Sequence, residues 1–157
     1  MKFKTFLAGC LGGLLSLNSC TNSPDMTDYV AYVNPFIGTG GHGHTFPGAI
    51  VPHGMISPSP DTRIDGWDAC SGYYYADSTI NGFSHTHLSG TGCCDYGDVL
   101  LMPTVGEQKY LPTGSQSQQM AYASAFSHQN ETAEPGYYSV FLDTYQVKAE
   151  LTASKRA

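Results

Sequence analysis

Hydrophobic and polar residues alternate along several short stretches of the chain, and glycine or proline separates these stretches. The clearest case is 147–152, where apolar residues at 147, 149 and 151 alternate with polar residues. Alternation with a period of two predicts a strand with one buried and one solvated face. Further strands are expected at 29–37, 55–59, 81–88, 99–103, 120–126 and 136–142. Because no stretch has a convincing helical pattern, we expect an all-β domain, an antiparallel β-sandwich.

The stretch Asn81–Asp98 joins one of these strands to a glycine-rich loop. Phe83, His85 and His87 are expected to share one face of the strand, because successive side chains alternate between faces. The loop at 89–97 contains three glycines, which permit backbone angles closed to other residues. Loops held by a rigid sheet often carry binding residues. This stretch is therefore a candidate site.

Residues 1–19 are expected to be a lipoprotein signal peptide. Lys2 and Lys4 precede an apolar run at 6–17 that is too short for a membrane-spanning helix. The run ends in Leu-Asn-Ser-Cys20, which resembles a bacterial lipobox and implies cleavage before Cys20 and lipidation of its sulfur. The alternative is an ordinary signal peptide with an incidental cysteine. Residues 20–28 are polar and are expected to form a tether to a domain at 29–157.

Composition and charge restrict the class of ligand. Only 13% of residues are charged, while the chain has 18 Gly and 9 Pro, which favours a loop-rich β protein. The formal net charge of −6 argues against nucleic acid as a partner. No Lys or Arg lies between Arg63 and Lys109, although six carboxylates do. This acidic middle suits a cation or a polyhydroxylated ligand; the alternative is a solvated acidic face.

A second glycine-rich segment, at 38–49, does not indicate nucleotide binding. Glycine-rich phosphate loops need a following helix, and the P-loop needs a lysine. Pro47 and Pro52 oppose a helix here, and no lysine follows.

Trp67, the only tryptophan, is expected at the rim of the domain because it follows Gly66 and lies among Asp65 and Asp68. There it would stack on the apolar face of a sugar while the carboxylates accept hydrogen bonds from hydroxyls. The alternative is a rim tryptophan that packs against Tyr73–Tyr75.

The cysteines and histidines leave several interpretations open. In an exported protein, Cys70, Cys93 and Cys94 permit a disulfide, for which we expect Cys70 with Cys93. Their spacing does not suit a zinc ribbon. Five histidines are candidates for metal binding, for contact with ligand hydroxyls, or for structural hydrogen bonds: His42, His44, His53, His85 and His87.

With these residues in view, the chain resembles the N-terminal part of glycoside hydrolase family 92, the exo-acting α-mannosidases common in gut Bacteroidetes. The resemblance is long, ordered and specific. It rests on segments 33–39, 41–49, 60–63, 66–68, 82–90, 93–98, 135–140 and 148–152.

The resemblance implies a β-sandwich packed against an (α/α)6 barrel, with the active site in the cleft between them. It implies an inverting α-mannosidase, of the α-1,2 type, which hydrolyses mannose-rich glycans with calcium. The acid, the base and the calcium ligands would lie in the barrel, so no catalytic or metal-binding residue is assigned to this chain. We expect the chain to be truncated after Ala157 and inactive alone. Its lipidated Cys20 would anchor it in the bacterial outer membrane.

By position in the resemblance, this domain supplies one wall of the substrate pocket. The residues expected to face substrate or to brace the cleft are Trp67, Asp68, Asp61, Arg63, His85 and His87. Two alternatives belong to other classes of protein: a lipid-anchored carbohydrate-binding module without hydrolase activity, and a histidine-rich metal-binding lipoprotein.

Overall fold

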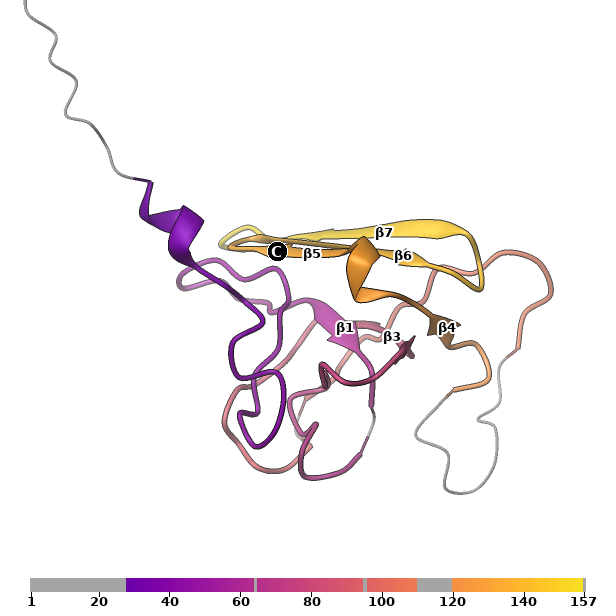
Figure 1. Cartoon of the computed structure of the whole chain (residues 1–157), viewed down its shortest axis with the longest axis horizontal. Coiled ribbons are helices and arrows are strands. Elements are labelled where there is room, and N and C mark those ends of the chain that lie inside the picture. Colours follow the sequence, from indigo (N-terminus) through magenta and orange to yellow (C-terminus); the bar gives the residue numbers. More distant parts are fainter. Residues whose placement is uncertain (1–27, 64, 95, 110–119, 157) are drawn as a thin grey trace, which may run out of the picture.

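A computed structural model describes residues 28–63, 65–94, 96–109 and 120–156 (Figure 1). Its elements in chain order are η1 (Tyr29–Tyr32), β1 (Ser59–Asp61), β2 (Thr79–Ile80), β3 (Gly82–Ser84), β4 (Ser124–Ala125), η2 (His128–Asn130), β5 (Glu131–Glu134), β6 (Tyr137–Leu142) and β7 (Val147–Thr152). The strands pair antiparallel as β1–β3, β2–β4 and β5–β6–β7. The described part of the chain is all-β, as predicted.

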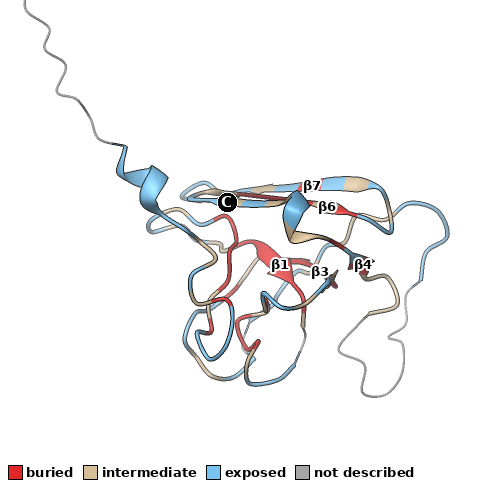
Figure 2. Cartoon of the chain, viewed as in Figure 1, coloured by how far each residue is buried: buried red, intermediate tan, exposed pale blue. Residues whose placement is uncertain are grey.

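The β5–β6–β7 meander lies over the two small sheets, and the core lies between them (Figure 1). The core is built from side chains of both layers: Ile80, Phe83, Phe126, Tyr138, Val140, Leu142 and Ala149. Figure 2 shows β1 and β3 as buried segments beneath the meander. Burial of each large apolar side chain contributes about 1.5–3 kcal/mol, so this cluster is the main apolar contribution to the fold.

The meander confirms the alternation read from the sequence. β6 pairs with β7 from Tyr137↔Thr152 to Leu142↔Val147, so both strands have the predicted boundaries within one residue. On β7, Ala149 is buried and the polar residues at 148, 150 and 152 are exposed. The buried face of β7 therefore packs on the core, and its other face is solvated.

The strand predicted at 29–37 is wrong. Residues 29–32 form the 3-10 helix η1, whose start is capped by the Asp28 carboxylate accepting from Val30 N at 3.1 Å. Asn34 makes the same kind of contact with Phe36 N at 3.0 Å. Short polar side chains that satisfy nearby backbone groups in this way favour turns over sheet pairing.

Other predicted strands are displaced or shorter. The strand expected at 55–59 begins only at Ser59, and the strand expected at 120–126 is reduced to β4. In 99–103 only Leu101 pairs, as an isolated bridge to Phe83. Val99 has a φ of 55°, in the left-handed region, which turns the chain away from extended pairing just before that bridge.

A buried carboxylate joins the loop layer to the meander. Glu131 of β5 has a side chain only 1% exposed. It accepts hydrogen bonds from the Tyr73 hydroxyl at 3.0 Å and the Tyr138 hydroxyl at 2.6 Å. His128 Nδ1 lies 2.6 Å from its other oxygen. Burial, together with the charge of Glu131, raises the pKa of Tyr73 and Tyr138 well above the usual value.

Because of these contacts between Glu131 and the two tyrosines, we expect the fold to lose stability at high pH. Unfolded tyrosines ionise near pH 10, whereas Tyr73 and Tyr138 stay protonated in the fold. Their contribution to the free energy of unfolding is therefore present below about pH 10 and is lost as pH rises. The decline in unfolding free energy above pH 10 should be shallower in Tyr73→Phe/Tyr138→Phe than in the wild type, measured by urea denaturation. Tyr32→Phe, at an exposed tyrosine, is the control. Equal pH dependence in the wild type and the double variant would contradict this.

Candidate functional site

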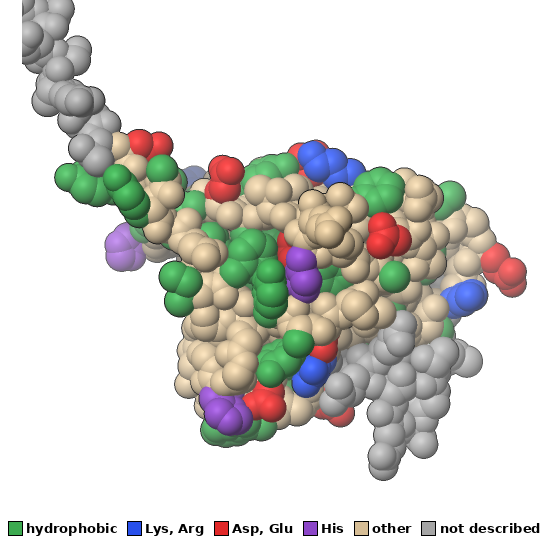
Figure 3. All heavy atoms as spheres, in the orientation of Figure 1, with side chains coloured by type: hydrophobic (Ala, Val, Ile, Leu, Met, Phe, Trp, Pro, Cys, Tyr) green, Lys and Arg blue, Asp and Glu red, His purple; other side chains and the backbone are tan. Residues whose placement is uncertain are grey.

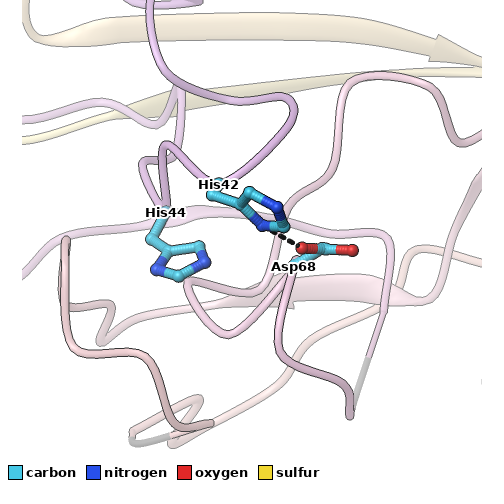
Figure 4. A group of neighbouring side chains, drawn as sticks. All are labelled: His42, His44 and Asp68. Carbon is cyan, nitrogen blue, oxygen red and sulfur yellow. Dashed lines mark hydrogen bonds and ion pairs between the residues drawn. The ribbon is translucent and has the colours of Figure 1, made fainter.

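Two loops that are distant in sequence meet around Trp67. The indole is 60% exposed, and its ring lies edge-on to the His44 ring, with centroids 4.8 Å apart. A Cβ atom placed on Gly92 would lie 2.7 Å from the indole, so the ring rests directly on that glycine. Beside it, Asp68 Oδ1 lies 2.7 Å from His42 Nδ1 (Figure 4). The expected rim position of Trp67 and Asp68 is what the structure shows.

Backbone packing holds the His42–His44 loop in this position. A Cβ atom on Gly43 would lie 2.1 Å from the Gly38 carbonyl oxygen, so no larger residue fits there. His44 has a φ of 53°, in the left-handed region, and its carbonyl accepts a hydrogen bond from Gly90 N at 2.8 Å. The loop is thus fixed to the segment that follows β3, and the His44 side chain is buried.

Asp61 and His87 form a buried pair beneath this surface. The Asp61 carboxylate accepts from Ser84 N at 2.8 Å, and its other oxygen lies 2.8 Å from His87 Nε2. His87 Nδ1 donates to the Ser57 carbonyl at 2.8 Å. A Cβ atom on Gly72 would lie 2.5 Å from Asp61 Oδ1, so the turn after Trp67 packs directly on the pair. Asp61 and His87 brace the loops from below.

Arg63 is held by its own partners at the edge of the site. Its guanidinium group forms a bidentate salt bridge with the Asp77 carboxylate, in which Nε and Nη2 donate at 2.9 Å and 2.7 Å. It also lies over the Tyr74 ring, 4.4 Å from the centroid. Hydrogen bonding to Asp77 raises the pKa of Arg63 further above its usual range. A hollow of about 160 Å³ opens here, lined in part by Asp61, Arg63 and His87.

The prediction that His85 shares a strand face with His87 is wrong. β3 ends at Ser84, and the chain bends at His85, so neither histidine lies in the strand. His85 Nδ1 lies 2.8 Å from the Val99 carbonyl oxygen, and His85 lines a separate hollow of about 490 Å³ between β3 and β7. His85 therefore lies apart from the Trp67 surface, while His87 lies beneath it.

Two further predictions concern cysteines. Cys70 is buried and carries a free thiol, so the expected pairing of Cys70 with Cys93 is not formed in the structure. The signal peptide at 1–19, Cys20 and the tether up to residue 27 lie outside the described residues. Within the ranges that are described, no helix is both long and apolar enough to cross a membrane.

Loss of the Asp61 carboxylate should be costly, because it leaves Ser84 N buried without its acceptor and removes one of the two partners of His87 Nε2. For Asp61→Ala we expect a loss of about 3–5 kcal/mol in unfolding free energy, measured by urea denaturation. Asp65→Ala, at an exposed aspartate of the next loop, should change it by less than about 0.5 kcal/mol. Similar losses of unfolding free energy in both variants would show that Asp61 does not stabilise the loops.

Comparison with known proteins agrees with these features. The profile of the glycosyl hydrolase family 92 N-terminal domain matches residues 32–157. An uncharacterized secreted glycosidase of Arthroderma benhamiae is 32% identical over 131 residues, covering 83% of this chain and 16% of the relative.

Solved structures show the same similarity. The family GH92 α-mannosidase BT3965 from Bacteroides thetaiotaomicron, solved with mannoimidazole, is 50% identical with a TM-score of 0.74, over 80% of this chain and 16% of that one. The inverting mannosidase BT2199 from the same organism is 32% identical with a TM-score of 0.63, over 85% of this chain and 17% of that one. This chain therefore spans about a sixth of the length of these relatives. It belongs to glycoside hydrolase family 92 and corresponds to the N-terminal domain of that family.

Proposed function

We propose that this chain forms one wall of the substrate cleft of an inverting, calcium-dependent α-mannosidase, of the α-1,2 type, that acts on mannose-rich glycans. The observation that carries the proposal is the exposed indole of Trp67, with polar groups of Asp68 and His42 at its side. An exposed aromatic face beside hydrogen-bonding groups suits a sugar ring, which has apolar faces and polar edges. The similarity to a mannosidase solved with mannoimidazole supports mannose as the sugar.

In this proposal the chain binds and orients the glycan. Trp67 stacks on one face of a sugar, and Asp68, whose side chain is 42% exposed, accepts hydrogen bonds from its hydroxyls. Asp61 and His87 act through the backbone that they hold rather than by touching substrate. Arg63 positions the rim through Asp77.

The catalytic acid and base are proposed to lie in the part of the enzyme outside this chain. Inversion requires two carboxyl groups about 6.5–9.5 Å apart, one to protonate the leaving oxygen and one to activate water. Asp61 is committed to His87, and Asp77 to Arg63. These buried or paired carboxylates suit a supporting role.

The potential metal ligands among the described residues do not suit calcium. The one group of three potential metal ligands within the described ranges is His42, His44 and Asp68, which offers two nitrogens and one carboxylate. Calcium takes six to eight oxygen ligands. We therefore place the calcium of this proposal in the remainder of the enzyme and route no step through it here.

Exposed apolar side chains favour an enzyme domain over a free carbohydrate-binding module. Met55, Val99, Leu101 and Val105 are each more than half exposed. Figure 3 shows hydrophobic side chains reaching the surface at several places on one face of the molecule. Apolar surface of this kind suits packing against a further domain, here the proposed barrel.

We also propose an exported protein, anchored in the bacterial outer membrane through a lipidated Cys20. The support is the lipobox-like sequence and the similarity to a glycosidase described as secreted.

Replacement of the Trp67 ring should weaken glycan binding. For Trp67→Ala we expect the affinity of the chain for α-1,2-mannobiose, measured by calorimetry, to fall about tenfold or more, which corresponds to at least about 1.4 kcal/mol of lost stacking. Tyr32→Ala removes another exposed ring, on η1, and should leave the affinity unchanged. Equal affinities in both variants, or no binding by the wild type, would refute a sugar platform at Trp67.

A further inference from the structure

We propose that His42, His44 and Asp68 form a binding site for a divalent metal ion of the zinc class. One potential ligand atom from each side chain lies within 4.8 Å of the other two. The side chains come from two loops, 38–45 and 65–72, and Figure 4 shows them converging. The His44 ring also contacts Trp67, with centroids 4.8 Å apart. The proposal stands on this geometry and does not depend on the glycan-binding role.

His44 provides an independent indication of a ligand. Its side chain is buried, with a residue exposure of 7%, and Nε2 has no hydrogen-bond partner. Buried polar atoms in native proteins are nearly always satisfied, and an unpaired one costs free energy. Figure 4 shows a ring nitrogen of His44 on the side that faces Asp68. A bound ion would supply the missing partner.

The distances bracket those of a metal site. Ligand atoms at about 2.0–2.1 Å from a tetrahedral zinc ion lie about 3.4 Å from one another. In the structure, His42 Nδ1 and Asp68 Oδ1 are closer than this, at 2.7 Å, because they share a hydrogen bond. The three ligand atoms all lie within 4.8 Å of one another. If an ion displaced the proton that His42 and Asp68 share, the distance between Nδ1 and Oδ1 would increase. A small movement of this pair toward His44 would shorten the distances to the His44 ring.

The His42 side chain has room to make this movement. Its side chain is 78% exposed, and neither Gly40 nor Gly41 has any atom within 4 Å of the position of a Cβ. His44 is fixed by contrast, because its carbonyl accepts a hydrogen bond from Gly90 N and its ring packs edge to face with Trp67. Metal binding would thus draw His42 and Asp68 toward a preformed His44.

The donor set selects the class of ion. Two imidazole nitrogens with one carboxylate suit zinc and similar ions, whereas calcium and magnesium require oxygen ligands. Three protein ligands leave a fourth position for water, on the side where His42 and Asp68 are exposed. The ion would join the loop before β1 to the loop that carries Trp67, and so fix the indole at the rim.

Titration of the full 157-residue chain with ZnCl₂ tests the site. Calorimetry should show zinc binding, and the fluorescence of Trp67, the only tryptophan, should change with the same dependence on zinc. CaCl₂ should give no such change. His42→Asn and Asp68→Asn should each weaken binding by about tenfold or more, since loss of even a group that only supports a metal ligand costs about 10–100-fold. His53→Asn replaces an exposed histidine outside the group and should bind as the wild type does.

Two results would overturn the proposal. The first is a wild-type chain whose circular dichroism shows a folded β protein but whose Trp67 fluorescence does not respond to zinc. The second is zinc binding that His42→Asn and Asp68→Asn leave intact, which would assign the ion to other groups, such as cysteine thiols. Circular dichroism of each variant checks that the fold is retained.

Discussion

The carboxylate of Asp61 fixes the loops that carry the candidate site. It lies at the end of β1, where strand pairing places it opposite Gly82, and it binds both Ser84 N and His87. Because Gly72 packs directly on the same carboxylate, the turn that follows Trp67 cannot move without disturbing this pair. A short strand pair thus gains rigidity from a buried carboxylate, a group that is costly to bury unless both of its oxygens have hydrogen-bond partners.

A second buried carboxylate, Glu131, fixes the loops to the β5–β6–β7 meander. It collects hydroxyl groups from Tyr73 in the loops and Tyr138 in the meander, together with His128. The loops are therefore fixed by two buried carboxylates, Asp61 through Gly72 and Glu131 through Tyr73. Strand pairing and apolar packing stabilise the meander, whereas the irregular segments around Trp67 have little regular pairing and depend more on these polar contacts. Such loops on a fixed support are where binding surfaces are expected.

Alternation in the sequence predicted the meander well, because β6 and β7 each have one face on the core and one in solvent. It did not identify β5, whose sequence Glu-Thr-Ala-Glu has almost no apolar signal, since its role depends on the Glu131 contacts across the fold. The strand predicted at 29–37 failed because Asp28 and Asn34 cap local turns. Trp67 and Asp68 were placed correctly at the rim by their polar, glycine-containing surroundings. The pairing of His42 with Asp68 was not predictable, because the two residues are 26 positions apart and no pattern in the sequence links them.

We propose that this chain binds substrate while other parts of the enzyme perform the chemistry. The most direct measurement is to incubate the purified chain with α-1,2-mannobiose and calcium, and to follow both sugar binding and the release of mannose. We expect binding without release, because Asp61 is held by His87 and Asp77 by Arg63, and Trp67 only stacks. Calcium-dependent release of mannose by the chain alone would contradict it.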